Sequence, residues 1–218
     1  MKIGILGGTF DPVHKAHLYV ALRVQLIFKL DCVLFMIAHV PPHKREVTSA
    51  FHRFSMVALA LLFHDDLVPC AWELERGGPS FTIDTLEHFA HNHSENQYCF
   101  IAGSDSLKEI HLWKDYVKLL ENHSFIFVQR LGREVELNEL KVPDPLRNRI
   151  KPLRARARPI IESGRSFLID LNAPDISSTS IRKLIAGGQH PPDLVPSRVL
   201  QYIQKHKLYG QEQYQGSY

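Results

Sequence analysis

The chain has 218 residues, of which 44% are apolar and 22% charged, and its formal net charge is +3. This profile is ordinary for one globular domain, expected over residues 1–210 with a frayed tail over 211–218. The longest apolar run, residues 56–63, is too short to cross a bilayer. Three scattered cysteines exclude a disulfide framework and argue against a zinc site. The N-terminal residues show no apolar signal-peptide stretch, and the cysteines are expected to be reduced thiols. We therefore expect a cytoplasmic location.

The first elements in the chain are a predicted strand, a glycine turn and a helix. Residues 3–6 are a short apolar run, which predicts a strand covered on both faces. Gly7 and Gly8 end the run and allow the backbone to approach a ligand closely. A loop through residues 9–12 leads to a helix that is apolar from 18 to 30. Because a helix N-terminus carries unpaired N–H groups and partial positive charge, the turn predicts a phosphate site.

Two histidines follow this turn. His14 and His17 are three residues apart, so on a helix they share one face and point at the same anion. The glycines match neither known phosphate fingerprint. A dinucleotide loop would need glycine at positions 6 and 9, and a phosphate loop would need Gly-Lys at positions 13 and 14.

A second strand is predicted over residues 32–38, and two prolines then stiffen a loop that presents His43 and Lys44. Open α/β sheets bind ligands beyond the carboxyl ends of their strands, so this loop is a candidate phosphate contact. A plain proline turn with a solvated lysine is the alternative. Apolar spacing then predicts a helix over residues 49–63, and residues 68–73 predict a third strand.

The middle of the chain offers three polar or aromatic candidates. A Gly-Gly-Pro turn at residues 77–79 precedes a helix that Ser80 or Thr82 can cap. A fourth strand over 98–102 leads to Asp105, which can accept hydrogen bonds from ribose hydroxyls or cap a helix. Trp113 is either a half-buried packing residue or a surface on which a flat ring stacks. The residues alone leave these alternatives open.

A fifth strand is predicted over residues 124–129, and a basic insert follows over 130–165. Six Lys or Arg residues and no acid occur within residues 147–158. Without interleaved aromatic residues or clear helical phase, this run favours a solvated loop or an oligomer contact. Nucleic acid or anionic lipid is the alternative partner.

A final strand over residues 166–171 leads to another helix N-terminus. The hydroxyl groups of Ser178 and Thr179, together with unpaired N–H groups, can bind an anion. Arg182 lies in the first turn, where its charge opposes the helix dipole and should have an anion nearby. A simply capped helix is the alternative. A last helix is predicted from about residue 195 to residue 209.

Strands that alternate with helices predict an α/β fold. We expect a Rossmann-like, doubly wound parallel sheet of five to six strands, with helices on both faces and a small C-terminal helical part. The segments 7–17, 41–44 and 177–182 would then converge on one edge of the sheet. Three anion-seeking segments at one edge suggest a triphosphate.

Residues 7–17, Gly-Gly-Thr-Phe-Asp-Pro-Val-His-Lys-Ala-His, resemble the first signature of the nucleotidyltransferase superfamily with the HxGH-type motif. Residues 177–182, Ser-Ser-Thr-Ser-Ile-Arg, resemble its last signature. Residues 41–44, 78–85 and 103–107 are similar to further motifs, most closely to those of bacterial nicotinate mononucleotide adenylyltransferases. One departure is Ala16, which adds a Cβ where the family usually has glycine beside the phosphate path.

The resemblance implies an enzyme that transfers the adenylyl group of ATP to nicotinate mononucleotide and releases pyrophosphate. His14, His17, Lys44 and Arg182 would be catalytic, through alignment and neutralisation of the phosphates. Mg²⁺ would accompany ATP, without a protein metal site. Nicotinate mononucleotide would be bound by Thr85 at its carboxylate, by Asp105 and by stacking on Trp113. ATP would be bound by Gly7, Gly8, Thr9, Phe10, His14, His17, Lys44, Ser178, Thr179 and Arg182.

Two other readings stay open. A sister adenylyltransferase would use nicotinamide mononucleotide or phosphopantetheine as the acceptor. A non-enzymatic protein would bind metal through its histidines or nucleic acid through the basic run. We expect ATP and nicotinate mononucleotide as partners, with neither nucleic acid nor membrane, and leave a homo-oligomer open.

Overall fold

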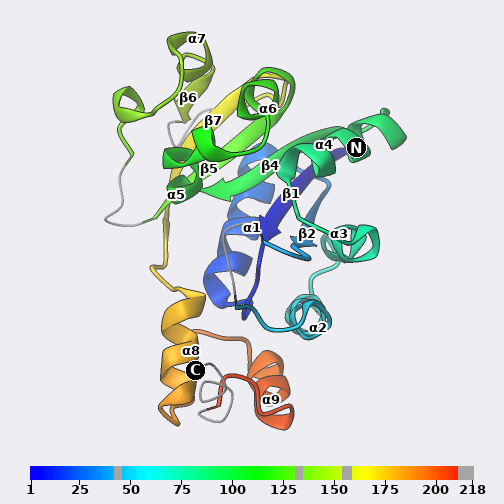
Figure 1. Cartoon of the computed structure of the whole chain (residues 1–218), viewed down its shortest axis with the longest axis vertical. Helices are drawn as coiled ribbons and strands as arrows, with labels where there is room; N and C mark the ends of the chain where they lie inside the picture. Colours follow the sequence, from blue (N-terminus) through cyan, green and yellow to red (C-terminus); the bar gives the residue numbers. More distant parts are fainter. Residues whose placement is uncertain (42–45, 131–134, 154–158, 211–218) are drawn as a thin grey trace.

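The structure is a computed structural model that describes residues 1–41, 46–130, 135–153 and 159–210 (Figure 1). Seven strands form one sheet in the order β3-β2-β1-β4-β5-β7-β6, and every pair of neighbours is parallel. The strands are β1 (Lys2–Gly8), β2 (Cys32–Ile37), β3 (Leu67–Cys70), β4 (Gln97–Gly103), β5 (Ser124–Arg130), β6 (Ile150–Leu153) and β7 (Ser166–Ala173).

Helices cover both faces of this sheet, as the predicted doubly wound fold requires. One face packs against α1 (Lys15–Phe28), α2 (Ala50–Leu61), α8 (Ser178–Ala186) and α9 (Ser197–Lys205). The other packs against α4 (Thr82–Asn92), α5 (Ser104–Lys108), η1 (Ile110–Leu112), α6 (Tyr116–Asn122) and α7 (Asp144–Arg147). Two short elements complete the set, α3 (Trp72–Arg76) and η2 (Leu137–Glu139). In Figure 1, α8 and α9 lie together at one end of the molecule.

Alternation along each strand divides the apolar residues between the two cores. Ile5 and Phe100 belong to the core under α4, α5 and α6, whereas their neighbours Leu6 and Ile101 belong to the core under α1 and α2. All four side chains are buried. Strands buried on both faces therefore appear as continuous apolar runs, which is why the sequence located the central strands well.

The direction of chain progression reverses between β1 and β4. From β1 the chain moves outward to β2 and β3, and it then returns to add β4 on the other side of β1. Ligands in doubly wound sheets bind at such a reversal, beyond the carboxyl ends of the strands. In this chain those ends are Gly8 and Gly103.

The sheet differs from the prediction in two places, both at its edges. It has seven strands rather than five to six, because β6 lies inside the expected basic insert. Lys151 and Pro152 interrupt its apolar pattern, as is usual for an edge strand. At the opposite edge, β3 contains Pro69 and ends at Cys70, so the expected strand over 68–73 is shorter and α3 follows it.

The basic residues that the structure describes in this segment are partly engaged in local contacts. Arg147 donates to the carbonyl oxygens of Leu140 and Val142 and pairs with Asp144 at 2.8 Å. Arg149 donates to the carbonyl oxygen of Gly164. Arg154, Arg156 and Arg158 lie outside the described residues. In the described part of the chain, no helix is long and apolar enough to cross a membrane.

Candidate active site

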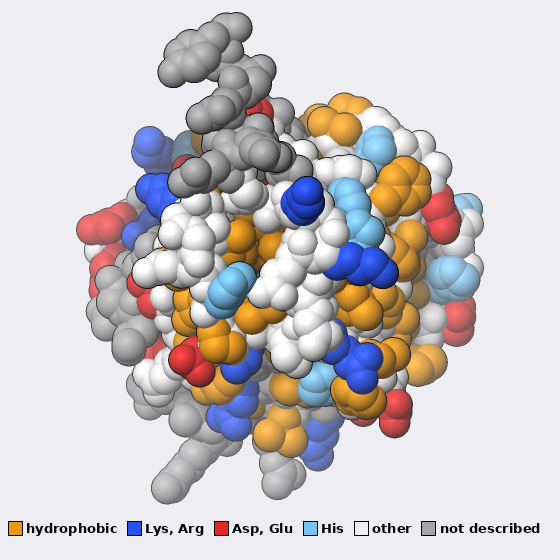
Figure 2. Space-filling model, turned by 90° about the horizontal axis from the view of Figure 1, so that it is seen from below, with side chains coloured by type: hydrophobic (Ala, Val, Ile, Leu, Met, Phe, Trp, Pro, Cys, Tyr) orange, Lys and Arg blue, Asp and Glu red, His pale blue; other side chains and the backbone are white. Residues whose placement is uncertain are grey.

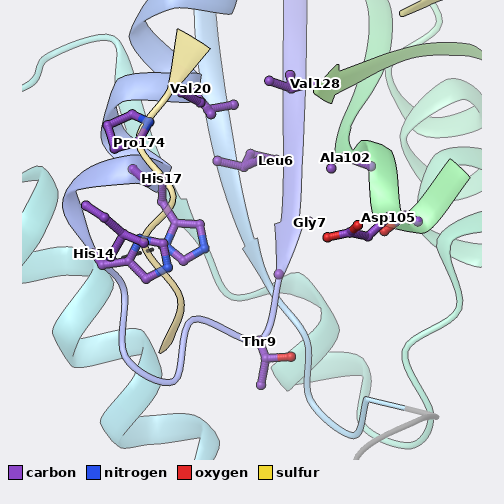
Figure 3. Close-up of a pocket in the computed structure, with 16 residues that line it drawn as sticks. Leu6, Gly7, Thr9, His14, His17, Val20, Ala102, Asp105, Val128 and Pro174 are labelled. Atoms are coloured by element: carbon purple, nitrogen blue, oxygen red, sulfur yellow. Dashed lines mark hydrogen bonds between the residues drawn. The ribbon is translucent and has the colours of Figure 1, made fainter. Parts of the chain in front are cut away.

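A cavity of about 300 Å³ opens at the point where chain progression reverses (Figure 3). Its walls come from the end of β1, the start of α1, the end of β4 with the start of α5, Val128 of β5, and the end of β7 with the residues that follow it. Gly7 lies in this wall, and a Cβ there would come within 2.3 Å of the buried Phe100 ring. Glycine is therefore required at this position, and the backbone stays open to a ligand.

His14 and His17 stand together on one side of this cavity (Figure 3). Their rings are stacked with centroids 3.6 Å apart, and the backbone N–H of His14 donates to His17 Nδ1 at 3.2 Å. The buried Phe10 ring packs nearly perpendicular to the His17 ring, with ring centroids 5.0 Å apart. Because Nδ1 accepts a hydrogen bond, a neutral His17 carries its proton on Nε2. That tautomer can donate to a phosphate oxygen without a charge on the ring.

The placement of Phe10 and Ala16 refines the expected phosphate contacts. Phe10 is buried in the core below His17 and is not among the residues that line the cavity. Ala16 does line it, so the position at which the family usually has glycine belongs to the cavity wall. Gly8 and Thr9 also line the cavity. Lys44 lies outside the described residues.

Asp105 lies on the opposite side of the cavity from the histidines (Figure 3). It is the second residue of α5, and Gly103 occupies the N-cap position. The N-cap is therefore Gly103, and the ribose contact of Asp105 stays a prediction. A carboxylate across the cavity from two histidines is placed to accept hydrogen bonds from ligand hydroxyl groups.

A second cavity of about 210 Å³ adjoins the first, and Ser106 lines both. Trp113 and Phe81 form part of its wall. Trp113 meets Phe100 edge to face, with ring centroids 6.2 Å apart, so its orientation is fixed by the core. Lys114 also lines this cavity and pairs with Asp84 at 2.7 Å. The second cavity thus offers an aromatic wall to a flat ring.

Thr85 does not line either cavity. Its side chain is buried, and its hydroxyl donates to Glu73 at 2.5 Å. Glu73 also forms a hydrogen bond with Ser80, whose hydroxyl accepts from the backbone N–H of His39 at 2.8 Å. The Thr85 hydroxyl is thus engaged with Glu73, and the expected contact of Thr85 with a nicotinate carboxylate stays a prediction. Thr85 instead fixes the first turn of α4, next to the cavity residues Phe81 and Thr82.

The buried Glu73 carboxyl predicts a pH-dependent stability. Burial raises its pKa, and the hydrogen bonds from Ser80 and Thr85 only partly oppose this effect. A raised pKa in the folded state means that stability is greatest with the proton bound and falls as pH rises through that pKa. As pH rises above about 4.5, the ordinary pKa of a glutamate, the melting temperature of Glu73→Gln should therefore gain on that of the wild type. The exposed neighbour variant Glu75→Gln should follow the wild-type curve, and parallel curves for Glu73→Gln would refute the expectation.

The third segment in which an anion site is expected is the start of α8. Ser177 is the N-cap and accepts from the backbone N–H of Ser180. Ser178 donates to the carbonyl oxygen of Pro12 at 2.9 Å, and Arg182 donates to that of Asp11 at 2.6 Å. Thr179 Oγ1 lies 3.5 Å from Arg182 Nη2. The structure thus joins α8 to the loop that precedes His14, although these segments are far apart in the sequence.

Comparison with known proteins agrees with this geometry. A family model described as cytidylyltransferase-like matches residues 5–184. A protein of Thermoanaerobacter sp. (strain X514), named "Probable nicotinate-nucleotide adenylyltransferase", is 37% identical over 219 residues, with 99% of this chain and 98% of the relative covered. A protein of Shewanella sp. (strain MR-7) with the same name is 35% identical, with 96% and 99% covered. The chain belongs to the nicotinate-nucleotide adenylyltransferase family.

Solved structures show that the fold of this family member extends to distant relatives. The Plasmodium falciparum nicotinic acid mononucleotide adenylyltransferase complexed with NaAD superposes with a TM-score of 0.75 at 21% identity, covering 95% of this chain and 97% of that one. The same enzyme complexed with APC gives a TM-score of 0.71 at 20% identity, covering 95% and 96%. At this level of identity, the likeness establishes the fold.

Sequence reasoning missed several residues that shape the site in this family member. Ser106 joins the two cavities, and Asp11 holds the loop before His14 to Arg182. Arg53 is completely buried on α2 beside Met56 and Val57. A signal for Arg53 was present, because helical phase places it on the apolar face of that helix. A charged residue on such a face needs polar partners.

Proposed function

We propose that this chain transfers the adenylyl group of ATP to the 5′-phosphate of nicotinate mononucleotide, giving nicotinate adenine dinucleotide and pyrophosphate. One observation carries this proposal. The paired histidines and Asp105 face each other across a cavity that adjoins, at Ser106, a second cavity walled by Trp113. Two adjoining cavities can accommodate two nucleotides, with their phosphates meeting near the histidines. The family relationship supports the same reaction.

The chemistry requires alignment more than activation. A phosphate oxygen of the acceptor attacks the α-phosphorus of ATP, a new P–O bond forms, and the bond to the β-phosphate oxygen breaks. The nucleophile is already an anion, so neither a covalent intermediate nor a strong base is needed. His17 Nε2–H and His14 would contact the α-phosphate region. Lys44 and Arg182 would neutralise the departing pyrophosphate, with Ser178 and Thr179 at the adjacent helix N-terminus.

Charge distribution on the molecule suits a polyanion. Figure 2 views the end that carries α8 and α9, where Lys, Arg and His side chains lie across the middle of the face and most acidic side chains lie toward its rim. Such a field attracts ATP and raises its local concentration. We assign the adenosine triphosphate to the first cavity and the nicotinate ring to the wall formed by Trp113, with Asp105 as a ribose contact.

Mg²⁺ would enter with ATP. Among the residues that the structure describes, no group of three or more His, Cys, Asp or Glu side chains is arranged to hold a metal ion. We propose that phosphate oxygens and water, and not a protein cage, hold this cation. When bound, the cation would supply charge neutralisation on the phosphates.

A cytoplasmic location fits the chemistry of the cysteines. Cys32, Cys70 and Cys99 are free thiols. Burial raises the pKa of the Cys99 thiol to about 12, and it also raises the pKa of Cys32 and of Cys70. Thiols that stay protonated are poor nucleophiles, and persistent free thiols are typical of a reducing compartment.

An acceptor assay tests the proposed reaction. Purified protein with ATP and Mg²⁺ is given nicotinate mononucleotide, nicotinamide mononucleotide or phosphopantetheine, and pyrophosphate release is measured for each. The highest kcat/KM is expected with nicotinate mononucleotide. Equal or greater turnover with another acceptor would instead identify a sister adenylyltransferase.

A further inference from the structure

Arg53 is a buried cation that the reaction itself does not use. It lies on α2, its side chain has no exposed surface, and neither cavity is lined by it. Burial of a charge is costly, and replacement by an apolar residue of similar volume often leaves stability unchanged or improved. Stability is therefore a weak explanation for an arginine at this position.

The Arg53 guanidinium donates four hydrogen bonds to backbone carbonyl oxygens. Nη1 donates to Thr9 at 2.9 Å and to Ala38 at 2.6 Å, Nη2 donates to His39 at 3.0 Å, and Nε donates to Thr48 at 2.7 Å. Thr9 precedes His14 in the loop after β1. Ala38 and His39 follow β2, and Thr48 stands just before α2. The rigid guanidinium therefore joins the loop between β1 and His14, here called the histidine loop, to the residues on both sides of the segment 40–47.

Thr48 also forms hydrogen bonds with Asp11 and Tyr209. Its backbone N–H donates to Asp11 Oδ2 at 3.2 Å, and the hydroxyl of Tyr209 donates to Asp11 Oδ1 at 2.6 Å. Tyr209 also forms a hydrogen bond with the Thr48 side chain. The peptide groups of Thr48 are thus held on both sides, by Arg53 at the carbonyl oxygen and by Asp11 at the N–H.

We propose that Arg53 is a positioning residue, whose guanidinium fixes the spacing between the histidine loop and the segment after β2 and thereby sets the geometry in which ATP is bound. This inference rests on the proposed function for the identity of the ligand. Catalysis by alignment is sensitive to displacements of about 1 Å, because the reacting atoms must stay in line. A lysine at position 53 keeps the charge but cannot place donors at all four carbonyl oxygens.

The test compares Arg53→Lys with the matched control Arg147→Lys. Arg147 also donates to backbone carbonyl oxygens, yet it lines neither cavity. Per folded protein, Arg53→Lys should lower kcat/KM for ATP about tenfold or more while KM for nicotinate mononucleotide changes less than about twofold. Arg147→Lys should lower the melting temperature and leave both kinetic parameters unchanged. Kinetics of Arg53→Lys that match the wild type would overturn the proposal.

Two further measurements keep the test decisive. If Arg53→Lys does not fold, Tyr209→Phe provides the second test, because it removes the hydrogen bonds of the Tyr209 hydroxyl with Asp11 and Thr48. This variant should raise KM for ATP severalfold. An unchanged KM would overturn the proposal. ATP affinity measured by calorimetry needs no acceptor. Wild-type protein that binds ATP but does not adenylylate nicotinate mononucleotide would count against the proposed function alone, and weaker ATP binding by Arg53→Lys would still support the role of Arg53.

Discussion

Replacement of His17 by alanine is expected to lower kcat by about two orders of magnitude, equivalent to about 3 kcal/mol of transition-state stabilisation. The loss follows from the position of the ring. The backbone N–H of His14 donates to His17 Nδ1, and the Phe10 ring packs against the His17 ring, so the orientation of Nε2–H is set before the substrate arrives. A donor held in advance costs no reorganisation during the reaction, and water cannot replace it equally well.

The measurement is steady-state pyrophosphate release by the purified variant, with circular dichroism and thermal melting as tests of folding. His91 is exposed near the end of α4, and His91→Ala serves as the matched control with unchanged turnover. If His17→Ala remained folded and retained near-normal kcat, the phosphate contact assigned to His17 would be wrong.

Replacement of Arg182 by methionine should have the second largest effect, a loss of about two orders of magnitude in kcat/KM for ATP. The guanidinium donates to the Asp11 carbonyl oxygen at 2.6 Å and lies 3.9 Å from the Asp11 carboxylate. Arg182 is the fifth residue of α8, and its side chain reaches back to the loop before His14. A bound pyrophosphate group would accept further hydrogen bonds from this guanidinium, and methionine keeps an unbranched apolar side chain without the charge.

Lys183 provides the control on the same helix. It is exposed, so Lys183→Met removes an equal charge from α8 without removing a proposed phosphate contact. ATP titrations of both variants, followed by initial rates, should show the loss for Arg182→Met alone. Equal small losses in the two variants would indicate a general effect of net charge, and the specific contact would then be rejected.

The sequence was most informative where one local pattern determines the structure. The central strands are continuous apolar runs. A strand end or helix start is indicated by the glycine turn, by the paired histidines and by the Ser-rich start of α8. The glycine turn and the histidines line one cavity, and hydrogen bonds from Ser178 and Arg182 join the start of α8 to the loop before His14. Parallel topology brings these segments to the same edge of the sheet. The family resemblance rests on the same segments, which is why the fold and the reaction were both accessible.

The remainder depends on tertiary contacts that no local pattern encodes. The direction of the Thr85 side chain is decided by Glu73, which lies on a different element. Edge strand β6 has only four residues, one of them a lysine and one a proline, so its pairing with β7 decides its conformation. Arg53 had a visible signal, but its four partners are backbone atoms from separate segments. Backbone carbonyl groups are present at every residue, so the sequence does not indicate which of them Arg53 contacts.

Pro69 and Pro152 lie on the two outermost strands of the sheet. A strand from another molecule that tried to extend the sheet would meet a missing N–H donor at either margin. The sheet is therefore a poor template for cross-β growth, even though its inner strands are rich in β-branched and aromatic residues. Any association between copies of this chain should use helix surfaces and not a shared sheet.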